Sequence, residues 1–320
     1  MRLVLMGTGA FALPTFQCLA VRSHQIVTVV TRPVPPASGR QKKGPVNPVR
    51  DWALQEALPV IDPADINDPR VQRALAELTP DLLVVCDYGQ ILSPVTLQLA
   101  RLGGINLHGS LLPRYRGAAP VNWAIWRGET ETGVTVIHMT GKLDAGPCLA
   151  TARVAIDPDE DAVELEHRLA RLGVEPVLDS ISLLSAWDGE TVIGVPQNPA
   201  EATGARRLRK SDGVVDWSNH AQQIRNQVRA LKPWPSTFAQ FNGPKGPVPL
   251  ILDKVCVVPP ADNPPTGKPG HVVRVEKDLL WVATGQGCLQ ILRIKPSGKR
   301  AMDVAEFLRG HPVRVGDTFT

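Results

Sequence analysis

The first 190 residues alternate between short apolar runs and longer stretches whose apolar residues recur with helical spacing. The short runs are rich in β-branched and aliphatic residues, and they predict strands at 2–6, 26–30, 60–61, 81–85 and 105–108. The stretches between them predict helices at 11–19, 48–57, 69–78 and 93–100. This alternation is typical of an α/β domain, so we expect a doubly wound, mostly parallel, Rossmann-like sheet.

The pattern changes after residue 108. Paired strands at 134–139 and 148–156 and a long amphipathic helix at 161–187 complete the predicted first domain, 1–190. Residues 195–204 are rich in Pro, Ala, Asn and Gly without periodicity, which is typical of a linker, placed here at 191–207.

The remainder, 208–320, has a pattern of its own. One helical stretch at 218–230 precedes short β-rich segments that Pro and Gly turns separate, at 237–241, 249–258, 270–275, 279–284 and 288–294. Short strands divided by such turns favour a small barrel. We therefore expect a smaller C-terminal β-barrel domain with an OB-like fold.

Composition is that of an ordinary soluble globular protein, with 43% hydrophobic and 21% charged residues among 320. No apolar run has the length of a signal peptide or a membrane span, so we expect a cytoplasmic protein that does not enter a membrane. The five cysteines are scattered and never form a C-x-x-C pair, so neither a disulfide framework nor a metal site is expected. The lack of a long exposed apolar helix favours a monomer.

Charge is distributed unevenly along the chain. The net charge is +4, but residues 1–203 carry −5 and residues 204–320 carry +9. The first 50 residues are also basic, with no acidic residue before Asp51. Such an asymmetry indicates a polyanionic partner, although a solvated basic face is nearly as common.

Asn106 and His108 are the most informative residues of the predicted strand at 105–108. Side chains alternate along a strand, so these two point the same way while Ile105 and Leu107 point into a core. The strand ends at Gly109 and Ser110, in the kind of loop that carries sites in wound α/β sheets.

Asp144 is the third residue of this candidate site, in the segment Leu143-Asp144-Ala145-Gly146. An amide supplies a fixed donor, an imidazole can exchange a proton near neutral pH, and a carboxylate can orient that imidazole. Together they could stabilise an oxyanion and move a proton. Because no G-x-S-x-G nucleophile motif is present, acyl transfer by direct attack of a bound amine fits best.

Gly7-Thr8-Gly9-Ala10-Phe11-Ala12 matches the G-x-G-x-x-G/A pattern that follows the first strand of dinucleotide-binding domains. The second strand ends at Thr31-Arg32, without the acidic residue that would hold a ribose diol. A tight turn without a nucleotide is therefore favoured, although Arg32 could meet a 2′-phosphate.

Several longer motifs carry a family resemblance. They are Asn106-x-His108, Ser110-Leu111-Leu112-Pro113, Arg114-Tyr115-Arg116-Gly117-Ala118-Ala119-Pro120, and Gly133-Val134-Thr135 through Leu143-Asp144-x-Gly146. The chain resembles the 10-formyltetrahydrofolate-dependent formyltransferases. The likeness extends to Asp216-Trp217, Pro233-Trp234-Pro235 and the segment 296–302, as in the branch that formylates methionyl initiator tRNA. The chain departs from the family pattern at Cys86, Asp87, Thr140, Lys142 and Gly204.

The resemblance implies a role for each matched residue. Asn106 and His108 would polarise the formyl carbonyl, and Asp144 would fix the imidazole and help to carry the proton. The folate donor, 10-formyltetrahydrofolate, would lie against two segments. These are Tyr88, Gly89, Gln90, Ile91 and Leu92, and then Ser110, Leu111, Leu112 and Pro113.

The resemblance also assigns basic residues to the initiator tRNA. Arg40, Lys42 and Lys43 lie in the family's inserted loop, which from composition alone is more simply a solvated loop. The phosphate contacts would continue on the C-terminal domain, through Arg206, Arg207, Arg209, Lys210, Lys299 and Arg300.

Three other functions remain open from the sequence. A formyltransferase acting on a sugar-nucleotide amine would use the same three residues without needing the basic loop and basic second domain. An RNA-binding protein without catalysis would bind even after loss of Asn106, His108 and Asp144. An NADP-dependent reductase would use the segment 7–12 and Arg32.

Overall fold

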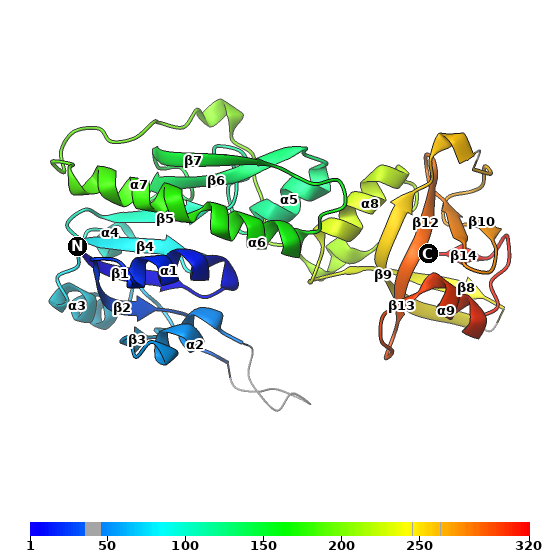
Figure 1. Cartoon of the computed structure of the whole chain (residues 1–320), viewed down its shortest axis with the longest axis horizontal. Coiled ribbons are helices and arrows are strands. Elements are labelled where there is room, and N and C mark those ends of the chain that lie inside the picture. The colour runs from blue at the N-terminus through cyan, green and yellow to red at the C-terminus, as the bar shows by residue number, and fades with distance from the viewer. Residues whose placement is uncertain (36–45, 245, 263) are drawn as a thin grey trace. The chain divides into compact units, whose positions relative to one another are not determined.

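The computed structural model describes residues 1–35, 46–244, 246–262 and 264–320. The chain forms two compact units (Figure 1). Unit 1 comprises Met1–Pro120, Glu131–Ala155 and Glu164–Arg206, and unit 2 comprises Val121–Thr130, Ile156–Val163 and Arg207–Thr320. The predicted domain boundaries, at 190 and 208, stay a prediction.

Unit 1 is built on a seven-stranded sheet in the order β3-β2-β1-β4-β5-β6-β7. The strands are β1 (Arg2–Gly7), β2 (Gln25–Val30), β3 (Val60–Ile61), β4 (Leu82–Cys86), β5 (Gly104–His108), β6 (Glu131–His138) and β7 (Cys148–Ala155). The pairs from β3 to β5 are parallel, and β6 and β7 add antiparallel strands beside β5. The predicted mostly parallel sheet is confirmed.

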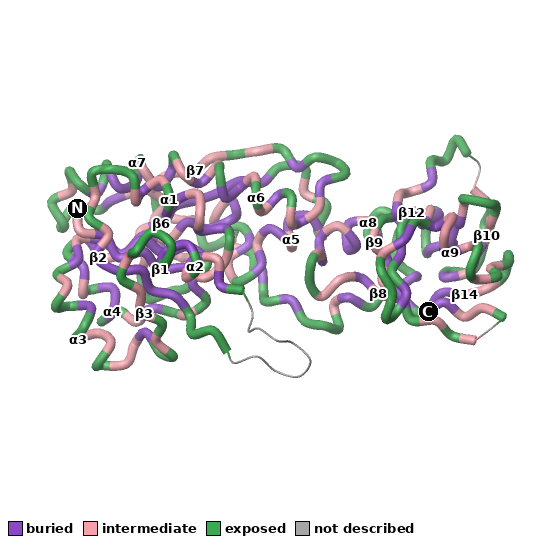
Figure 2. Tube along the Cα trace, turned by 60° about the horizontal axis from the view of Figure 1, so that its bottom comes forward, coloured by how far each residue is buried: buried purple, intermediate pink, exposed green. Residues whose placement is uncertain are grey.

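The central strands β1, β4 and β5 are buried along nearly their whole length (Figure 2), which is typical of a sheet that helices cover on both faces. One face packs Val4, Met6, Leu83 and Val85 against Leu75 and Leu97 of two helices. The helices of unit 1 are α1 (Leu13–Ala20), α2 (Pro48–Gln55), α3 (Pro69–Glu77), α4 (Pro94–Leu97), α6 (Ala162–Leu172) and α7 (Val174–Ser185). The first two residues of α6 belong to unit 2.

The predicted single helix at 161–187 is two helices, α6 and α7, which meet at Gly173. A methyl group on Gly173 would lie 2.5 Å from the Leu107 side chain of β5. The chain therefore comes so close to the central sheet at this point that no larger residue would fit without a shift. The period of apolar residues continues across the break, which is why the sequence pattern did not reveal it.

Unit 2 contains an antiparallel sheet in the order β10-β11-β12-β9-β8-β14, with β13 paired to β12. The strands are β8 (Thr237–Gly243), β9 (Gly246–Val257), β10 (Val272–Val275), β11 (Leu280–Ala283), β12 (Cys288–Pro296), β13 (Met302–Asp303) and β14 (Thr318–Phe319). A bridge between His271 and Thr318 joins the two ends of the path. The result is a nearly closed barrel, as predicted.

The barrel core is aromatic as well as aliphatic. Phe241, Phe307 and Phe319 are buried together, with ring centroids of Phe241 and Phe319 5.2 Å apart. Phe307 comes from α9 (Val304–Gly310), a short helix that the sequence pattern did not predict. α8 (Ala221–Ala230) packs on the barrel through Ile224 and Val228, and α5 (Pro120–Arg127) lies largely in this unit.

Three findings concern membrane spans, metal sites and cysteines. No helix among the described residues is long and apolar enough to span a membrane. Within the same residues, no group of three or more His, Cys, Asp or Glu side chains is arranged to hold a metal ion. All five cysteines lie in the described ranges and carry free thiols.

Candidate active site

β5 sets the direction of Asn106 and His108. The strand lies between β4, which runs parallel to it, and β6, which runs antiparallel. Ile105 and Leu107 are buried in the core, with relative exposures of 0% and 2%. Alternation along the strand then directs Asn106 and His108 to the other side, as the sequence predicts. His108 is itself 6% exposed, so its ring is held by its surroundings.

The Asp144 carboxylate lies next to Asn106 and His108. Its Oδ2 atom accepts a hydrogen bond from the backbone N–H of Gly117 at 2.8 Å and lies 3.7 Å from His108 Nδ1. Its Oδ1 atom accepts from Asn106 Nδ2 at 3.5 Å. The Asp144 side chain is 10% exposed and that of His108 is 7% exposed. Amide, imidazole and carboxylate therefore meet at a site that is mostly shielded from water.

The Tyr115 carbonyl fixes the imidazole from its other side. His108 Nε2 lies 2.9 Å from this oxygen. A carbonyl oxygen can only accept, so Nε2 carries a hydrogen and donates it. Nδ1 is then the ring atom that can gain or lose a proton, and it is the one that faces Asp144. The site therefore has one defined position for proton exchange.

Two residues in this arrangement have unusual backbone angles. Tyr115 and Asp144 have φ values of 61° and 47°, in the left-handed region that residues other than glycine seldom adopt. Such conformations cost about 1–3 kcal/mol each and persist where the surroundings impose them. Both residues contact His108, so the strain is located at the candidate site.

The segment after β5 forms a tight turn behind the site. The Thr135 hydroxyl of β6 donates to the Ser110 carbonyl at 2.8 Å and accepts from the backbone N–H of Leu112 at 3.1 Å. The Ser110 hydroxyl donates to the Arg114 carbonyl at 2.7 Å and is fully buried. Ser110 thus shapes the turn, while Leu111, Leu112 and Pro113 are half-buried.

Comparison with known families identifies the family to which the chain belongs. Residues 1–181 match the formyl transferase family, and residues 207–312 match the formyl transferase C-terminal domain family. The chain belongs to the formyl transferase family. Both matches agree with the resemblance that the motifs around Asn106 and Asp144 carry.

Relatives of this formyl transferase match it over nearly its whole length. A methionyl-tRNA formyltransferase of Rhodopirellula baltica is 44% identical and covers 99% of this chain and 96% of the relative. A methionyl-tRNA formyltransferase of Symbiobacterium thermophilum is 41% identical and covers 100% of this chain and 95% of the relative.

Solved structures share the fold at lower identity. HypX from Aquifex aeolicus, solved in complex with tetrahydrofolic acid, has a TM-score of 0.63 at 18% identity, over 100% of this chain and 50% of that chain. The N-formyltransferase from Helicobacter canadensis, solved with folinic acid and dTDP-3-aminofucose, has a TM-score of 0.62 at 15% identity, over 92% and 98%. At these identities the likeness shows the fold alone.

The predicted folate segment after β4 contains both buried and exposed residues in this formyl transferase. Tyr88 and Leu92 are 2% and 3% exposed, and burial raises the pKa of the Tyr88 phenol. Gln90 holds the neighbouring loop, since its side chain accepts from the Ile66 N–H and donates to the Pro63 carbonyl. Gly89 and Ile91 are exposed, and Ile91 is 69% exposed.

Exposed aliphatic side chains come from two neighbouring segments near Asp144. A methyl group on Gly141 would lie 3.3 Å from Pro94, so the loop that carries Leu143 is next to the start of α4. Ile91, Val95 and Leu143 are 69%, 56% and 60% exposed, and we refer to these three side chains as the exposed apolar patch. Exposed aliphatic side chains beside buried polar groups are typical of a small-molecule site.

The Gly7–Ala12 turn is occupied by the protein itself. The Asp87 carboxylate accepts from the backbone N–H of Gly9 and sits where a side chain on Gly9 would have to go. Burial, together with the nearby Glu166 carboxylate, raises the pKa of Asp87 to about 6. A carboxylate at the turn opposes the pyrophosphate of a dinucleotide, which supports the prediction of a tight turn without a nucleotide.

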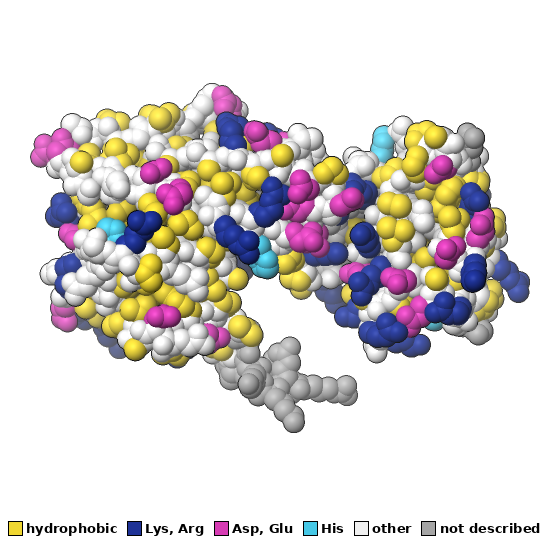
Figure 3. Space-filling model, viewed as in Figure 1, with side chains coloured by type: hydrophobic (Ala, Val, Ile, Leu, Met, Phe, Trp, Pro, Cys, Tyr) yellow, Lys and Arg dark blue, Asp and Glu magenta, His cyan; other side chains and the backbone are white. Residues whose placement is uncertain are grey.

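Some of the predicted RNA-binding residues lie among the residues that the structure describes, and others do not. Arg40, Lys42 and Lys43 lie outside the described residues. Lys and Arg side chains gather on the face of unit 2 seen in Figure 3, with acidic residues among them. The exposed residues of the predicted set are Arg206, Arg207, Arg209, Lys210, Lys299 and Arg300. Arg300 forms an ion pair with Glu306 at 2.6 Å, which reduces its available charge.

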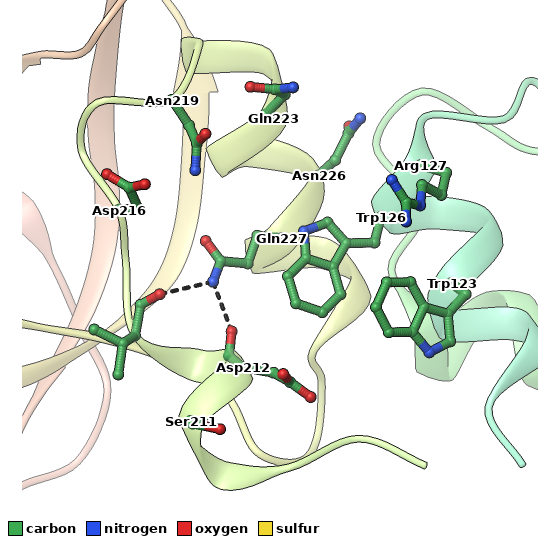
Figure 4. Close-up of a pocket in the computed structure, with 11 residues that line it drawn as sticks. Trp123, Trp126, Arg127, Ser211, Asp212, Asp216, Asn219, Gln223, Asn226 and Gln227 are labelled. Carbon is green, nitrogen blue, oxygen red and sulfur yellow. Dashed lines mark hydrogen bonds between the residues drawn. The ribbon is translucent and has the colours of Figure 1, made fainter. Parts of the chain in front are cut away.

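Unit 2 has a hollow of about 520 Å³ between α5 and α8 (Figure 4). Trp123 and Trp126 stack on one side of it, with ring centroids 4.9 Å apart. Two of its polar side chains already have partners in the protein: Gln227 donates to two carbonyls, and Asn226 accepts from Gln222 and Arg229. None of Asn106, His108 and Asp144 lines it.

Sequence reasoning missed three groups that hold the site, two of which belong to the backbone. The Tyr115 carbonyl, the Gly117 N–H and the Thr135 hydroxyl all hold the candidate residues or the turn behind them. A signal was present, because all three residues lie within the motifs that carry the family resemblance. Side-chain chemistry alone does not identify a residue that acts through its backbone.

Proposed function

We propose that this formyl transferase transfers the formyl group of 10-formyltetrahydrofolate to the amino group of methionyl initiator tRNA. The products are formylmethionyl-tRNA and tetrahydrofolate. The relatives named methionyl-tRNA formyltransferase, at 44% and 41% identity over nearly the full length, support this acceptor. The observation that carries the chemistry is the shielded Asp144 carboxylate, which lies against Asn106, His108 and the Gly117 N–H.

The proposed reaction is direct attack of the methionyl amine on the formyl carbon. A new C–N bond forms, and the carbonyl electron pair moves to oxygen. The electron pair on the oxygen then re-forms the carbonyl as the bond from the formyl carbon to the folate nitrogen breaks, with the electron pair of that bond going to the nitrogen. A proton leaves the attacking amine and ends on the folate nitrogen, so no further reactant is needed.

The protein's part is to stabilise charge and to carry the proton. The Asn106 amide donates to the oxygen on which negative charge develops, and its position on β5 fixes it before reaction. His108 can receive or give a proton only at Nδ1, because Nε2 is committed to the Tyr115 carbonyl. A protonated ring would be stabilised by Asp144 at 3.7 Å. We therefore assign proton transfer to the His108–Asp144 pair.

The donor is proposed to lie against the exposed apolar patch of Ile91, Val95 and Leu143. A pterin and its neighbouring aromatic ring are flat, and aliphatic side chains pack well against flat rings. We propose that the polar edge of the pterin meets the backbone at Gly89, whose φ is 78°. The Thr135 hydroxyl fixes the turn 110–113, which is the second segment predicted to contact the donor.

The acceptor is proposed to be held by two sets of basic residues, one in the predicted inserted loop and one in unit 2. Arg209, Lys210 and Lys299 are exposed in unit 2, whose main segment belongs to the region with a net charge of +9. Arg40, Lys42 and Lys43 are proposed to contact the acceptor end of the tRNA. Phosphate contacts of this kind position the RNA without reading its sequence. Because the proposed acceptor is a charged tRNA, we place the reaction in the cytoplasm, with the enzyme acting as a monomer.

The test is formylation of charged initiator tRNA by the purified protein with 10-formyltetrahydrofolate. We expect formylmethionyl-tRNA as product, and a rate lower by about 10²–10⁴-fold for Asp144→Ala. A sugar-nucleotide amine, offered in place of the tRNA, should give no product. Formylation of that amine but not of the tRNA would contradict the proposed acceptor. Equal rates for Asp144→Ala and the unchanged protein would contradict the proposed role of the carboxylate.

A further inference from the structure

The segment 195–205 is fastened to unit 1 at both ends. Val195 and Cys148 exchange two backbone hydrogen bonds of 2.8 Å, so the start of the segment pairs with β7. At the other end, the Arg116 N–H donates to the Thr203 carbonyl at 2.8 Å, and the Ala205 N–H donates to the Arg116 carbonyl at 2.6 Å. This segment, which precedes the long C-terminal part of unit 2, therefore runs alongside residues 115–119 of the candidate site.

Close packing keeps the segment in this place. Gly117 has a φ of 121°, and a methyl group on it would lie 2.6 Å from the Ala205 carbonyl oxygen. Only glycine allows the two backbones to approach this closely at such an angle. The same Gly117 donates its N–H to Asp144, so the packing against the segment also sets one bond of the catalytic carboxylate.

Thr203 acts on His108 through Tyr115. Its hydroxyl oxygen accepts the Tyr115 N–H at 2.8 Å, and the Tyr115 carbonyl accepts His108 Nε2–H at 2.9 Å. Tyr115 is one of the two residues of the site in the left-handed region. A hydrogen bond to its N–H supports that strained conformation and so directs its carbonyl toward the imidazole.

Gln197 acts on Asp144 through the loop that carries it. The Gln197 Nε2 atom donates to the carbonyls of Asp144 and Gly146, at 2.9 and 2.7 Å. Its Oε1 atom accepts from Arg116 Nη2 at 2.6 Å and from Nε at 3.1 Å. A single amide thus joins the carboxylate's loop to the residue between Tyr115 and Gly117. Both its donors and its acceptor are used, which a carboxylate could not reproduce.

We propose that Gln197 and Thr203 are positioning residues, which hold the Asp144 carboxylate and the His108 imidazole in the arrangement that formyl transfer requires. The proposal rests on the proposed function for the meaning of that arrangement. It assigns the segment 195–205 to the support of the site as well as to the connection with the rest of the chain. Neither side chain needs to touch a substrate.

The first experiment compares Thr203→Val with Thr203→Ser. Valine keeps the shape of threonine and removes the hydroxyl, while serine keeps the hydroxyl. We expect kcat to fall by about 10–100-fold for the valine variant, since small displacements at a reacting centre have effects of this size. Serine should restore most of the rate. Thr203 is exposed, so its loss should leave thermal unfolding nearly unchanged. Thr191→Val, another exposed threonine of unit 1, serves as the matched control.

The second experiment uses Gln197→Glu, which keeps the size of the side chain and loses its donors. We expect a lower kcat with little change in KM for either substrate, because the affected groups act on the reaction and do not hold the substrates. Glu201→Gln, the reverse change on the same segment, should behave as the unchanged enzyme. A higher KM with an unchanged kcat would contradict the proposal, since it would assign the segment to substrate binding.

A third measurement does not depend on the substrate. Nitrogen NMR of the free enzyme reports which ring nitrogen of His108 carries the hydrogen. We expect Thr203→Val to shift the Nε2 signal, and Thr203→Ser to leave it in place. Identical His108 signals in all three proteins would overturn the proposal. If the unchanged enzyme fails to formylate the tRNA while these NMR shifts occur, the proposed acceptor is wrong and the positioning role stands.

Discussion

The two units of this formyl transferase use their polar residues in opposite ways. In unit 1, Asn106, His108 and Asp144 are directed into one site and make polar contacts of 2.8–3.7 Å. In unit 2, the candidate RNA-binding residues Arg209, Lys210 and Lys299 are exposed at the surface. The proposed active site has a few polar groups at fixed positions, and the proposed RNA-binding surface has exposed charges.

This difference has a physical reason. Stabilising a developing oxyanion requires donors that are already in place, since reorganisation during the reaction would cancel the gain. Attraction of a polyanion depends mainly on the number of positive charges near its phosphates. Single substitutions in the site of unit 1 should therefore have large effects on rate, and single substitutions on unit 2 should have small, additive effects on binding. Four predictions test this contrast, from the largest expected effect to the smallest.

The largest effect is expected at His108. His108→Asn removes Nδ1, the proposed position of proton exchange, and should reduce kcat by about 10²–10⁴-fold. The KM for tRNA should change little, because unit 2 carries most of the proposed phosphate contacts. Steady-state kinetics at varied tRNA concentration separates the two quantities. A rise in the KM for tRNA as large as the fall in kcat would contradict the proposal that unit 1 determines the rate and unit 2 determines tRNA binding.

The next effect concerns the stability of unit 2. Phe307 is fully buried and stacks on His311 with ring centroids 4.2 Å apart. Phe307→Ala should reduce the free energy of unfolding of this unit by about 3–5 kcal/mol, through lost contacts and a cavity. Hydrogen exchange should then rise across β8, β9 and β12 and stay unchanged across β1, β4 and β5. Equal acceleration in both units would show that they do not unfold separately.

A smaller effect is expected for the basic surface. Replacing Arg209, Lys210 and Lys299 with glutamine, one at a time, should weaken tRNA binding in similar steps. For each residue that contacts a phosphate, the slope of log K against log salt concentration should fall by about 0.7–0.9. The rate at saturating tRNA should stay that of the unchanged enzyme. If one replacement abolished binding and the others had no effect, the charges would not act additively.

The smallest effect concerns Asp87. Its pKa is raised to about 6 in the folded protein, against about 3.9 in an unfolded chain. A raised carboxyl pKa contributes stability that is full below about pH 4 and is lost as the pH rises through about 6. Asp87→Asn does not titrate, so its melting temperature relative to the unchanged protein should increase between pH 4 and pH 7. A constant difference across this range would contradict the assignment.

The sequence predicted the elements whose periodicity is strong. The alternation of Ile105, Asn106, Leu107 and His108 identified both the strand and the direction of its polar side chains, and the structure agrees. Five strands of the barrel, β8 to β12, were predicted because Pro and Gly turns separate them, whereas β13 and β14, of two residues each, were not predicted. α5 and α9 were missed: each is short, and its few buried residues give too little periodic signal.

The sequence predicted the side chains of the candidate site, but it did not predict the backbone conformations and contacts that hold them. Neither the left-handed backbone of Tyr115 nor that of Asp144 follows from residue type, since these conformations are imposed by tertiary contacts. Gln197 lies in a segment that has the composition of a linker, and it contacts Asp144, which is 53 positions away in the sequence. Composition reports how a segment would behave alone, and here its hydrogen bonds to unit 1 decide its conformation.

The discontinuity of unit 2 matters for anyone who recombines these proteins. α8 depends on residues from the first half of the chain: Asn122 donates to the Ala230 carbonyl, Arg225 donates to the Pro158 carbonyl, and Arg229 donates to the Glu160 carbonyl. A fragment that starts at 208 would lose all three bonds. A functional chimera between two such enzymes would therefore need its crossover to carry 121–130 and 156–163 together with the barrel.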